Sequence, residues 1–447
     1  MSLLSSTFVA FVALAWLAHL RAPRRARSVI LLVVSVLFYG WVHPWFAVVL
    51  VGSAAWSHAT ALAIRKYPER KLLALRVGLA GSAAVLLGFR AAGFYVDEVS
   101  AALGTLGVDA DPRALGFAVP AGLSFYVLMH ASYPIDVYWG KFKLRADAAE
   151  RTGWLDWLTV ATFFPLLLAG PIERVGRLLP QVEKDRVVDG AAVRAGLSLV
   201  AWGAFQKVVL ADTLAPYVGA VAAVEHPAPI LSWAAAVGFL VQMLVDFSGY
   251  ANLARGVARL FGFQVIANFD HPYLARTPAE FWTRWHISLS EWLRDYIFFP
   301  TYRSAFARRW LPLPQRLLAA RHHDSVRATV ATMVVSGLWH GIGWNFLLWG
   351  SMWAAAMIAQ QVVTPHLDAK TTGPGWRLAR SAPVQLGAMW AWNVLAHQVF
   401  REPTFAQLIA DLTSAPWAGT VDDRIAATVI LGFTGVAIAV SVGALWV

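Results

Sequence analysis

The chain has 447 residues, of which 58% are hydrophobic and 14% are charged, and its formal net charge is +11. Soluble globular domains carry about 25% charged residues, so the composition excludes that class. The excess Lys and Arg fall in loops between apolar runs, as the orientation of membrane helices by positive loops predicts, and we expect no nucleic-acid partner. The absence of Cys excludes disulfides, thiolate nucleophiles and thiolate metal ligands.

Continuous apolar runs predict an all-α, polytopic membrane protein, because a bilayer span needs about 20 apolar residues. In chain order, we expect spans at 5–20, 28–42, 45–64, 71–92, 116–138, 190–220, 229–254, 383–400 and 425–446. The run 326–363 is too long for one straight span and contains several glycines, which predicts a broken pair of helices meeting near His340. The total is ten or eleven transmembrane helices.

Loop charges predict the orientation of the first spans. No Lys or Arg precedes the first apolar run, so we expect that this run is not a cleavable signal peptide. The basic cluster at 21–27 follows it, which places the N-terminus outside and this loop in the cytoplasm. The basic stretches 65–76 and 141–151 are likewise expected in the cytoplasm, and the acidic stretch 97–111 outside.

The alternation of loop charge fails at the apolar run 154–169. The stretch behind it, 173–186, is basic and would lie outside if the run crossed the membrane. Prolines and a glycine at 163–171 break a helix there. We therefore expect this segment to be re-entrant or interfacial, and irregular backbone at membrane depth must line a protein-enclosed cavity.

Residues 255–327 form the only long segment that is not apolar. They carry eleven Arg against five acidic residues, with closely spaced aromatic residues at 278–299, which predicts helices lying at the cytoplasmic interface. We expect one domain over 1–447, comprising N-terminal helices (1–140), a catalytic core (154–363, including the interfacial tract 255–327) and C-terminal helices (383–447).

His340 is the first candidate catalytic residue, in the sequence VSGLWHG at 335–341. An ionisable side chain at membrane depth is costly, which favours a functional site, and imidazole suits proton transfer near neutral pH. The alternative is a histidine that only packs between helices. Beside His340, Trp339 supplies a wall and Gly341 a position where other groups can approach the backbone closely. Asn345 lies within about one turn of His340. This pattern suits a hydroxyl substrate entering a narrow channel, with His340 as general base.

His286 is the second candidate, in the tract 281–290. An interfacial amphipathic histidine is the competing interpretation. Arg284 precedes it, and Arg294 and Asp295 follow. Arg side chains in such a tract can bind the phosphates of a large anionic cofactor, or anchor to anionic lipid headgroups.

Two carboxylates stand at the edges of apolar runs. Asp136 and Asp246, the latter in DFSGY with Ser248, are interpreted either as proton-path groups or as structural residues paired with Arg or Tyr. The sequence His322-His323-Asp324 lies in a basic loop without a further ligand, so we expect no metal site there.

The motifs resemble those of the membrane-bound O-acyltransferase (MBOAT) family, in particular the bacterial subunits that acetylate alginate and related exopolysaccharides and the protein of teichoic-acid D-alanylation. In family order they are FYGW (38–41), PAGLSFY (120–126) continuing to Asp136, FFP (163–165), AGPI (169–172), DFSGY (246–250), NFD (268–270), PYLA (272–275), EFW (280–282), HISLS (286–290), WLRDY (292–296), GLWHG (337–341) and NF (345–346). The resemblance covers about residues 28–410.

This resemblance implies that His340 is the family's central histidine and His286 its second histidine. It also implies a funnel or tunnel joining a cytoplasmic donor to an acceptor on the far side. The second glycine-proline element reads GPIER at 170–174, a position where the branch varies. We expect these residues to bind or support the substrates: Trp339, Asn345, Arg284, Arg294, Asp295, Asp246, Ser248 and Asp136.

The expected function is O-acyl transfer in the inner (cytoplasmic) membrane of a bacterium. The donor is expected to be acetyl-CoA near the basic tract 276–309, and the acceptor a hydroxyl of an extracytoplasmic polysaccharide or of a periplasmic acetyltransferase partner. No metal is expected. An acyl-carrier-protein donor, as in D-alanylation, and a lipid or protein acceptor remain open. A transporter using His340, Asp136 and Asp246 as a proton relay is the alternative from another class.

Overall fold

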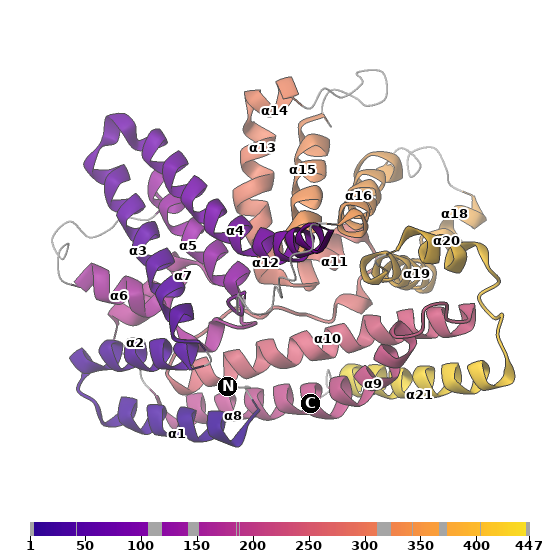
Figure 1. The fold of residues 1–447 in the computed structure, drawn as a ribbon, viewed down its shortest axis with the longest axis horizontal. Helices are drawn as coiled ribbons and strands as arrows, with labels where there is room; N and C mark the ends of the chain where they lie inside the picture. Colours follow the sequence, from indigo (N-terminus) through magenta and orange to yellow (C-terminus); the bar gives the residue numbers. More distant parts are fainter. Residues whose placement is uncertain are drawn as a thin grey trace. The chain divides into compact units, whose positions relative to one another are not determined.

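The computed structural model describes residues 4–41, 43–105, 119–141, 152–184, 186, 188–310, 323–341, 343–365, 373–402 and 404–443. Every regular element within these ranges is helical (Figure 1). The chain forms two compact units, the first from 1–202 and 250–266 and the second from 203–249 and 267–447. The all-α class is therefore confirmed.

The first unit is a set of helices packed through aromatic side chains. Its helices are α1 (Ser6–Arg21), α2 (Arg24–Gly40), α3 (Pro44–Lys66), α4 (Lys71–Thr105), α5 (Leu123–Tyr138), α6 (Thr152–Ala161), α7 (Val175–Glu183) and most of α8 (Gly190–Phe205). Trp157 of α6 stacks on Tyr133 of α5 at 4.2 Å between ring centroids. The indole of Trp157 also donates to the carbonyl of Ala54 on α3 at 2.9 Å, so the ring is both buried and hydrogen-bonded.

The second unit carries most of the basic, aromatic-rich tract 255–327 and the C-terminal half. Its elements are the π-helical turn η4 (Gln206–Ala211), α9 (Asp212–Ala222), much of α10 (Pro229–Leu260), α11 (Pro278–Arg284), α12 (Ile287–Leu293), the π-helical turn η6 (Arg294–Phe298), α13 (Phe299–Arg303), α14 (Ala305–Trp310), α15 (His323–His340), α16 (Trp344–Ile358), η8 (Ala359–Val363), α18 (Pro374–Ala379), α19 (Ala382–Arg401), α20 (Phe405–Thr413) and α21 (Val421–Gly443). In Figure 1, α13 and α15 run side by side.

Five helical segments are long and apolar enough to cross a membrane: Pro44–Lys66, Pro68–Phe89, Gly190–Ala222, Pro229–Leu260 and Val421–Gly443. The other expected spans coincide with shorter or more polar helices, so the count of ten or eleven stays a prediction. One expectation needs correction. The acidic stretch 97–111 was expected to be a loop, but α4 continues through Thr105, because Ala and Leu continue its helix-forming sequence. Residues 106–118 lie outside the described part.

The segment 154–169 is broken as predicted. Helix α6 ends at Ala161 after ten residues, a length of about 15 Å at 1.5 Å per residue, and cannot cross about 30 Å of hydrocarbon. Phe163 and Phe164 then turn into the unit's core, each no more than 2% exposed. The side of the membrane on which the segment lies stays a prediction.

Most aromatic residues of the tract 278–299 pack inward, although Phe299 is 41% exposed. Trp282 and Trp285 are each 8% exposed, and Phe281 stacks on Trp353 of α16 at 4.8 Å. The tract was predicted to consist of interfacial helices, and its depth in a membrane stays a prediction. Its large side chains nevertheless form the core of the second unit.

The run 326–363 is confirmed as a broken pair. Helix α15 ends at His340, and α16 begins at Trp344. The two helices touch at glycines, since a Cβ on Gly337 would collide with the carbonyl oxygen of Phe346 and one on Gly350 with that of Met333. Helix packing on glycines brings the backbones close together.

Gly337→Ala should destabilise the second unit. The added methyl meets backbone, which cannot swing aside as a flexible side chain would, and overpacking of this kind costs about 1–3 kcal/mol. The matched control is Gly387→Ala on α19, where nothing lies within 4 Å of the added Cβ. Thermal unfolding in detergent should show a lowered midpoint for the first variant only, and equal midpoints would contradict the close packing.

A cysteine replacing Arg177 should react only from the cytoplasmic face with a membrane-impermeant thiol reagent. The native chain has no Cys, and the Arg177 side chain is 45% exposed, whereas neighbouring Glu173 is fully buried and unsuitable for labelling. Lys141→Cys, in a loop expected on the same side, is the control. Labelling of position 177 from outside intact cells would show that 154–169 crosses.

Candidate active site

The two candidate histidines lie in one aromatic enclosure of the second unit. His340 is the last residue of α15, and His286 directly precedes α12. Trp339 lies between them, with its ring centroid 4.7 Å from that of His340 and 6.0 Å from that of His286. Residues 54 positions apart in the sequence are thus brought to one place by the packing of α15 on the tract around α12.

His340 is half-buried and is held edge-on by two further aromatic rings. Trp349 of α16 lies at 5.3 Å and Phe400 of α19 at 5.0 Å, both nearly perpendicular to the imidazole. Such T-shaped contacts help to fix the plane of a ring. The arrangement therefore orients the imidazole of His340.

His286 is more deeply buried, with 3% of its surface exposed, and contacts Phe247 of α10 at 4.7 Å. Burial in the first place, and the charge on His340 in the second, lower the pKa of His286 to about 3. The ring is therefore neutral near pH 7, with one nitrogen donating and one accepting. Its backbone has a φ of 42°, a left-handed conformation that non-glycine residues rarely adopt.

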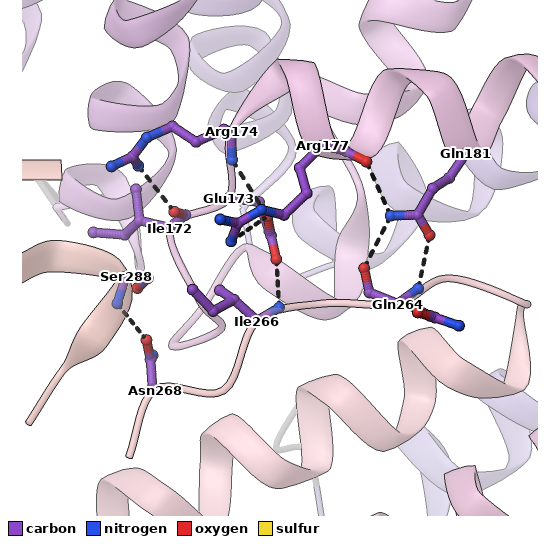
Figure 2. Close-up of polar contacts among 9 residues, drawn as sticks. All are labelled: Ile172, Glu173, Arg174, Arg177, Gln181, Gln264, Ile266, Asn268 and Ser288. Atoms are coloured by element: carbon purple, nitrogen blue, oxygen red, sulfur yellow. Dashed lines mark hydrogen bonds and ion pairs between the residues drawn. The ribbon is translucent and has the colours of Figure 1, made fainter. Parts of the chain in front are cut away.

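Backbone hydrogen bonds hold this unusual turn in place. Asn268 is 1% exposed, and its carbonyl accepts from the N–H of Ile287 at 2.9 Å. The side-chain oxygen of Asn268 accepts from the N–H of Ser288 at 3.3 Å (Figure 2). Asp270 N–H donates to the carbonyl of Arg284 at 3.0 Å. Contacts on both sides of His286 thus support its left-handed backbone, as a strained conformation requires.

The chain that leads to Asn268 is itself anchored within the first unit (Figure 2). One oxygen of the buried Glu173 accepts from the N–H of Ile266 at 2.6 Å, and the other lies 3.9 Å from Arg177. Gln181 pairs with both the N–H and the carbonyl of Gln264, at 2.8 and 3.0 Å. Burial raises the pKa of Glu173, while the hydrogen bonds and nearby cations oppose that rise.

Asp246 belongs to an ion cluster in the apolar part of the second unit. Lys207 lies 2.6 Å from a carboxylate oxygen of Asp246 and 2.6 Å from one of Asp212. The π-helical turn η4 carries Lys207 and also Gln206, whose amide donates to Ser248 at 2.9 Å. Pairing with Lys207 agrees with the structural interpretation of Asp246, except that the partner is Lys. A proton-path role stays a prediction.

The remaining predicted residues are dispersed. Arg284 is engaged by Glu280 at 3.0 Å and by the carbonyl of Asp270. Asn345 donates to the carbonyl of Phe400 at 2.9 Å, so it supports the enclosure from outside. Asp136 lies in the first unit, 3.8 Å from Lys141. Of these predicted residues, Asn345 contacts the enclosure of His340, whereas Arg284 and Asp136 belong to ion pairs of their own.

A cavity of about 340 Å³ adjoins the histidine turn within the second unit. Its wall is largely apolar, with Trp282, Ile287 and Leu293, and its polar lining includes Arg294. Arg294 pairs with Asp295 at 3.1 Å but keeps 54% of its side chain exposed. A volume of this size lies in the range of small-molecule sites, which run from about 300 to 1,000 Å³.

Several contributors were not predicted as site residues. Trp349 and Phe400 orient His340, Asn268 holds the His286 turn, and Lys207 neutralises Asp246. A lysine within an apolar run is the one sequence signal that could have identified Lys207. Among the described residues, no group of three or more His, Asp or Glu is placed to hold a metal ion.

The sequence is similar to a known family and to several named proteins. Residues 114–313 match the model of the membrane-bound O-acyltransferase family, a range that includes His286 and ends before His340. The probable alginate O-acetylase AlgI of Pseudomonas putida is 32% identical over 351 residues, 74% of this chain and 65% of that protein. The probable alginate O-acetylase AlgI of Azotobacter vinelandii is 30% identical over 84% of this chain and 73% of that protein. A peptidoglycan O-acetyltransferase of Helicobacter pylori is 26% identical over 73% of this chain and 63% of that protein.

The chain belongs to the membrane-bound O-acyltransferase family. The predicted family resemblance is thereby confirmed. The chain spans about two thirds of the length of these relatives, between 63% and 73%.

Asn268→Ala should reduce the activity that depends on His286. The substitution leaves the buried N–H of Ser288 without its acceptor, a loss of about 1–3 kcal/mol, and frees the left-handed turn. At 1.36 kcal/mol per tenfold change in rate, we expect activity to fall about 5- to 150-fold. Asn268→Ser, which offers a hydroxyl acceptor, should lose less. Wild-type acyl transfer in Asn268→Ala would contradict the positioning role.

Proposed function

We propose that this chain is a membrane O-acetyltransferase that moves an acetyl group from a cytoplasmic thioester, acetyl-CoA, to a hydroxyl on an extracytoplasmic polysaccharide or on its periplasmic acetyltransferase partner. The observation that carries the proposal is the enclosure in which Trp339 contacts both His286 and His340. Relatives named for the O-acetylation of alginate and of peptidoglycan support an acetyl group and a glycan acceptor.

In the proposed reaction, a nitrogen of His340 removes the proton of the attacking hydroxyl. The hydroxyl oxygen forms a bond to the thioester carbonyl carbon, and the carbon–sulfur bond breaks. The proton held by His340 passes to the leaving sulfur, so that no net charge accumulates. General base catalysis of this kind contributes about 10²–10⁴-fold.

His286 is assigned the orientation of the acyl donor. Its lowered pKa keeps the ring neutral, so it offers one hydrogen bond to the donor without a competing charge. The buried indole N–H groups of Trp282 and Trp349, which have no hydrogen-bond partner in the described part of the chain, supply further donors for a carbonyl oxygen. Stabilisation of developing negative charge by such donors is a large catalytic term.

The cavity beside the turn supports a place for the donor. It is apolar enough for an acyl chain or pantetheine arm, and the exposed Arg294 at its wall suits the phosphates of a coenzyme. Only the small acetyl group needs to pass the enclosure. The charged carrier, which is costly to bring into hydrocarbon, stays at the cytoplasmic side.

His340→Ala should abolish acetyl transfer while leaving the protein folded, because the half-buried imidazole supports chemistry more than packing. The assay follows transfer of radiolabel from acetyl-CoA by the purified protein, and reconstitution with a polysaccharide or partner acceptor defines the product. His323→Ala, at the other end of α15, is the matched control and should remain active. Activity of His340→Ala above about a tenth of wild type would exceed what loss of a base leaves. An absence of labelled product with wild-type protein and every acceptor would reject acetyl transfer itself.

His286→Asn should retain more activity than His286→Ala. Asn supplies a hydrogen bond, as orientation of the donor requires, but it cannot relay a proton. An equal loss in both variants would favour a relay, and full activity in both would show that His286 has no role in the reaction.

A further inference from the structure

A second cavity, of about 360 Å³, lies in the first unit between α3 and the beginning of α4. Its lining residues recur at intervals of three or four along each helix, which places them on one face of each. They are Trp56, Ala59, Thr60, Ala63 and Tyr67 on one side, and Arg70, Leu73, Ala74, Val77 and Gly78 on the other. The hollow exists because the central positions on both faces carry small side chains.

The wall of this α3–α4 cavity is held in a defined shape. The indole N–H of Trp56 donates to the carbonyl of Gly78 at 2.9 Å, and the hydroxyl of Thr60 donates to the carbonyl of Trp56 at 2.9 Å. A Cβ at Gly78 would collide with the side chain of Thr60. The polar groups inside the hollow are therefore engaged with the backbone, and the surface left for a ligand is apolar.

The mouth of the cavity is basic. Helix α3 and the segment Pro68–Phe89 are both long and apolar enough to span a membrane, and the chain passes from one to the other at Tyr67. Arg65, Lys66, Arg70 and Lys71 are all exposed at this end, against one acidic residue, Glu69. Arg70 is the cation that lines the cavity, and no ion pair joins it to any residue in the described part of the chain.

We propose that the α3–α4 cavity binds an anionic phospholipid, with one acyl chain in the apolar hollow and the phosphate at Arg70, beside Lys66. An apolar groove between two spans meets hydrocarbon, and a basic cluster at their ends meets anionic headgroups. A positive loop alone would attract such lipids diffusely. The hollow next to Arg70 provides a defined site for one lipid. The acyl chain of a zwitterionic lipid would also fill the hollow, but its headgroup has no net charge to neutralise Arg70.

Native mass spectrometry of the full chain in detergent tests this proposal. Phosphatidylglycerol and phosphatidylcholine with identical chains are titrated separately. We expect phosphatidylglycerol to bind at least about fivefold more tightly to wild type. Arg70→Gln should weaken phosphatidylglycerol about fivefold, the equivalent of about 1 kcal/mol for one cation near the membrane surface, and leave phosphatidylcholine unchanged. Arg76→Gln, exposed on α4 but outside the cavity lining, is the matched control and should bind as wild type does.

A second pair of variants tests the part of the proposal that places an acyl chain in the apolar hollow. Ala63→Phe fills the hollow and should weaken both lipids, whereas Leu72→Phe, which adds similar bulk to an exposed position outside the lining, should not. Glycerophosphoglycerol, the headgroup without chains, should fail to displace the lipid. Equal binding of the two lipids by wild type, equal effects of Arg70→Gln and Arg76→Gln, or displacement by the free headgroup would each overturn the proposal. The arginine variants decide it even if Ala63→Phe does not fold.

Discussion

The second unit is organised around the need to keep two imidazole rings ordered inside an apolar interior. A buried ionisable group is costly unless it stays neutral or has partners, and the surroundings of the histidines meet this requirement with aromatic rings. Trp339, Trp349 and Phe400 fix the planes of the rings through edge contacts. Hydrogen bonds from the main chain then hold His286 in a backbone conformation that a histidine would not adopt unaided.

The close approach of helices makes this enclosure possible. Gly337 and Gly350 allow α15 and α16 to pack backbone against backbone, so that the break after His340 lies close to the aromatic face of α16. Larger residues would push the two helices apart and would separate His340 from Trp349. The same principle operates at Gly249, where a Cβ would approach the carbonyl of Gly203 and the N–H of Lys207.

Charges within the apolar helices are matched locally. Lys207 pairs with Asp212 and Asp246, and a π-helical turn places the lysine where it reaches both carboxylates. All three side chains are partly exposed, with 18% for Lys207, 35% for Asp246 and 48% for Asp212, so solvent also compensates these charges. Asp246, the member of the cluster on α10, directly precedes Phe247, whose ring contacts His286. The ion pairs therefore help to fix the part of α10 that packs against the His286 turn.

The sequence by itself determined the class of protein and the family, and it singled out the two histidines that the structure brings to one enclosure. Long apolar runs with few charges require helices in a membrane. A histidine in such a run stands out in the sequence, because burying an ionisable side chain at membrane depth costs free energy. The end of α15 at His340 and the short helix before Phe163 also followed from Gly and Pro, which act locally on the backbone.

Only the tertiary structure decided which residues meet. Arg284 and Arg294 look alike in sequence, yet Arg284 pairs with Glu280 and does not line the cavity, whereas Arg294 pairs with its neighbour Asp295 and lies at the cavity wall. Asn268 became a support of His286 through hydrogen bonds that cross about 20 positions of chain, and Lys207 became the partner of Asp246 across two helices. Such pairings depend on helix rotation and on the size of the side chains between helices. No local pattern encodes those quantities, because they arise from packing of the whole unit.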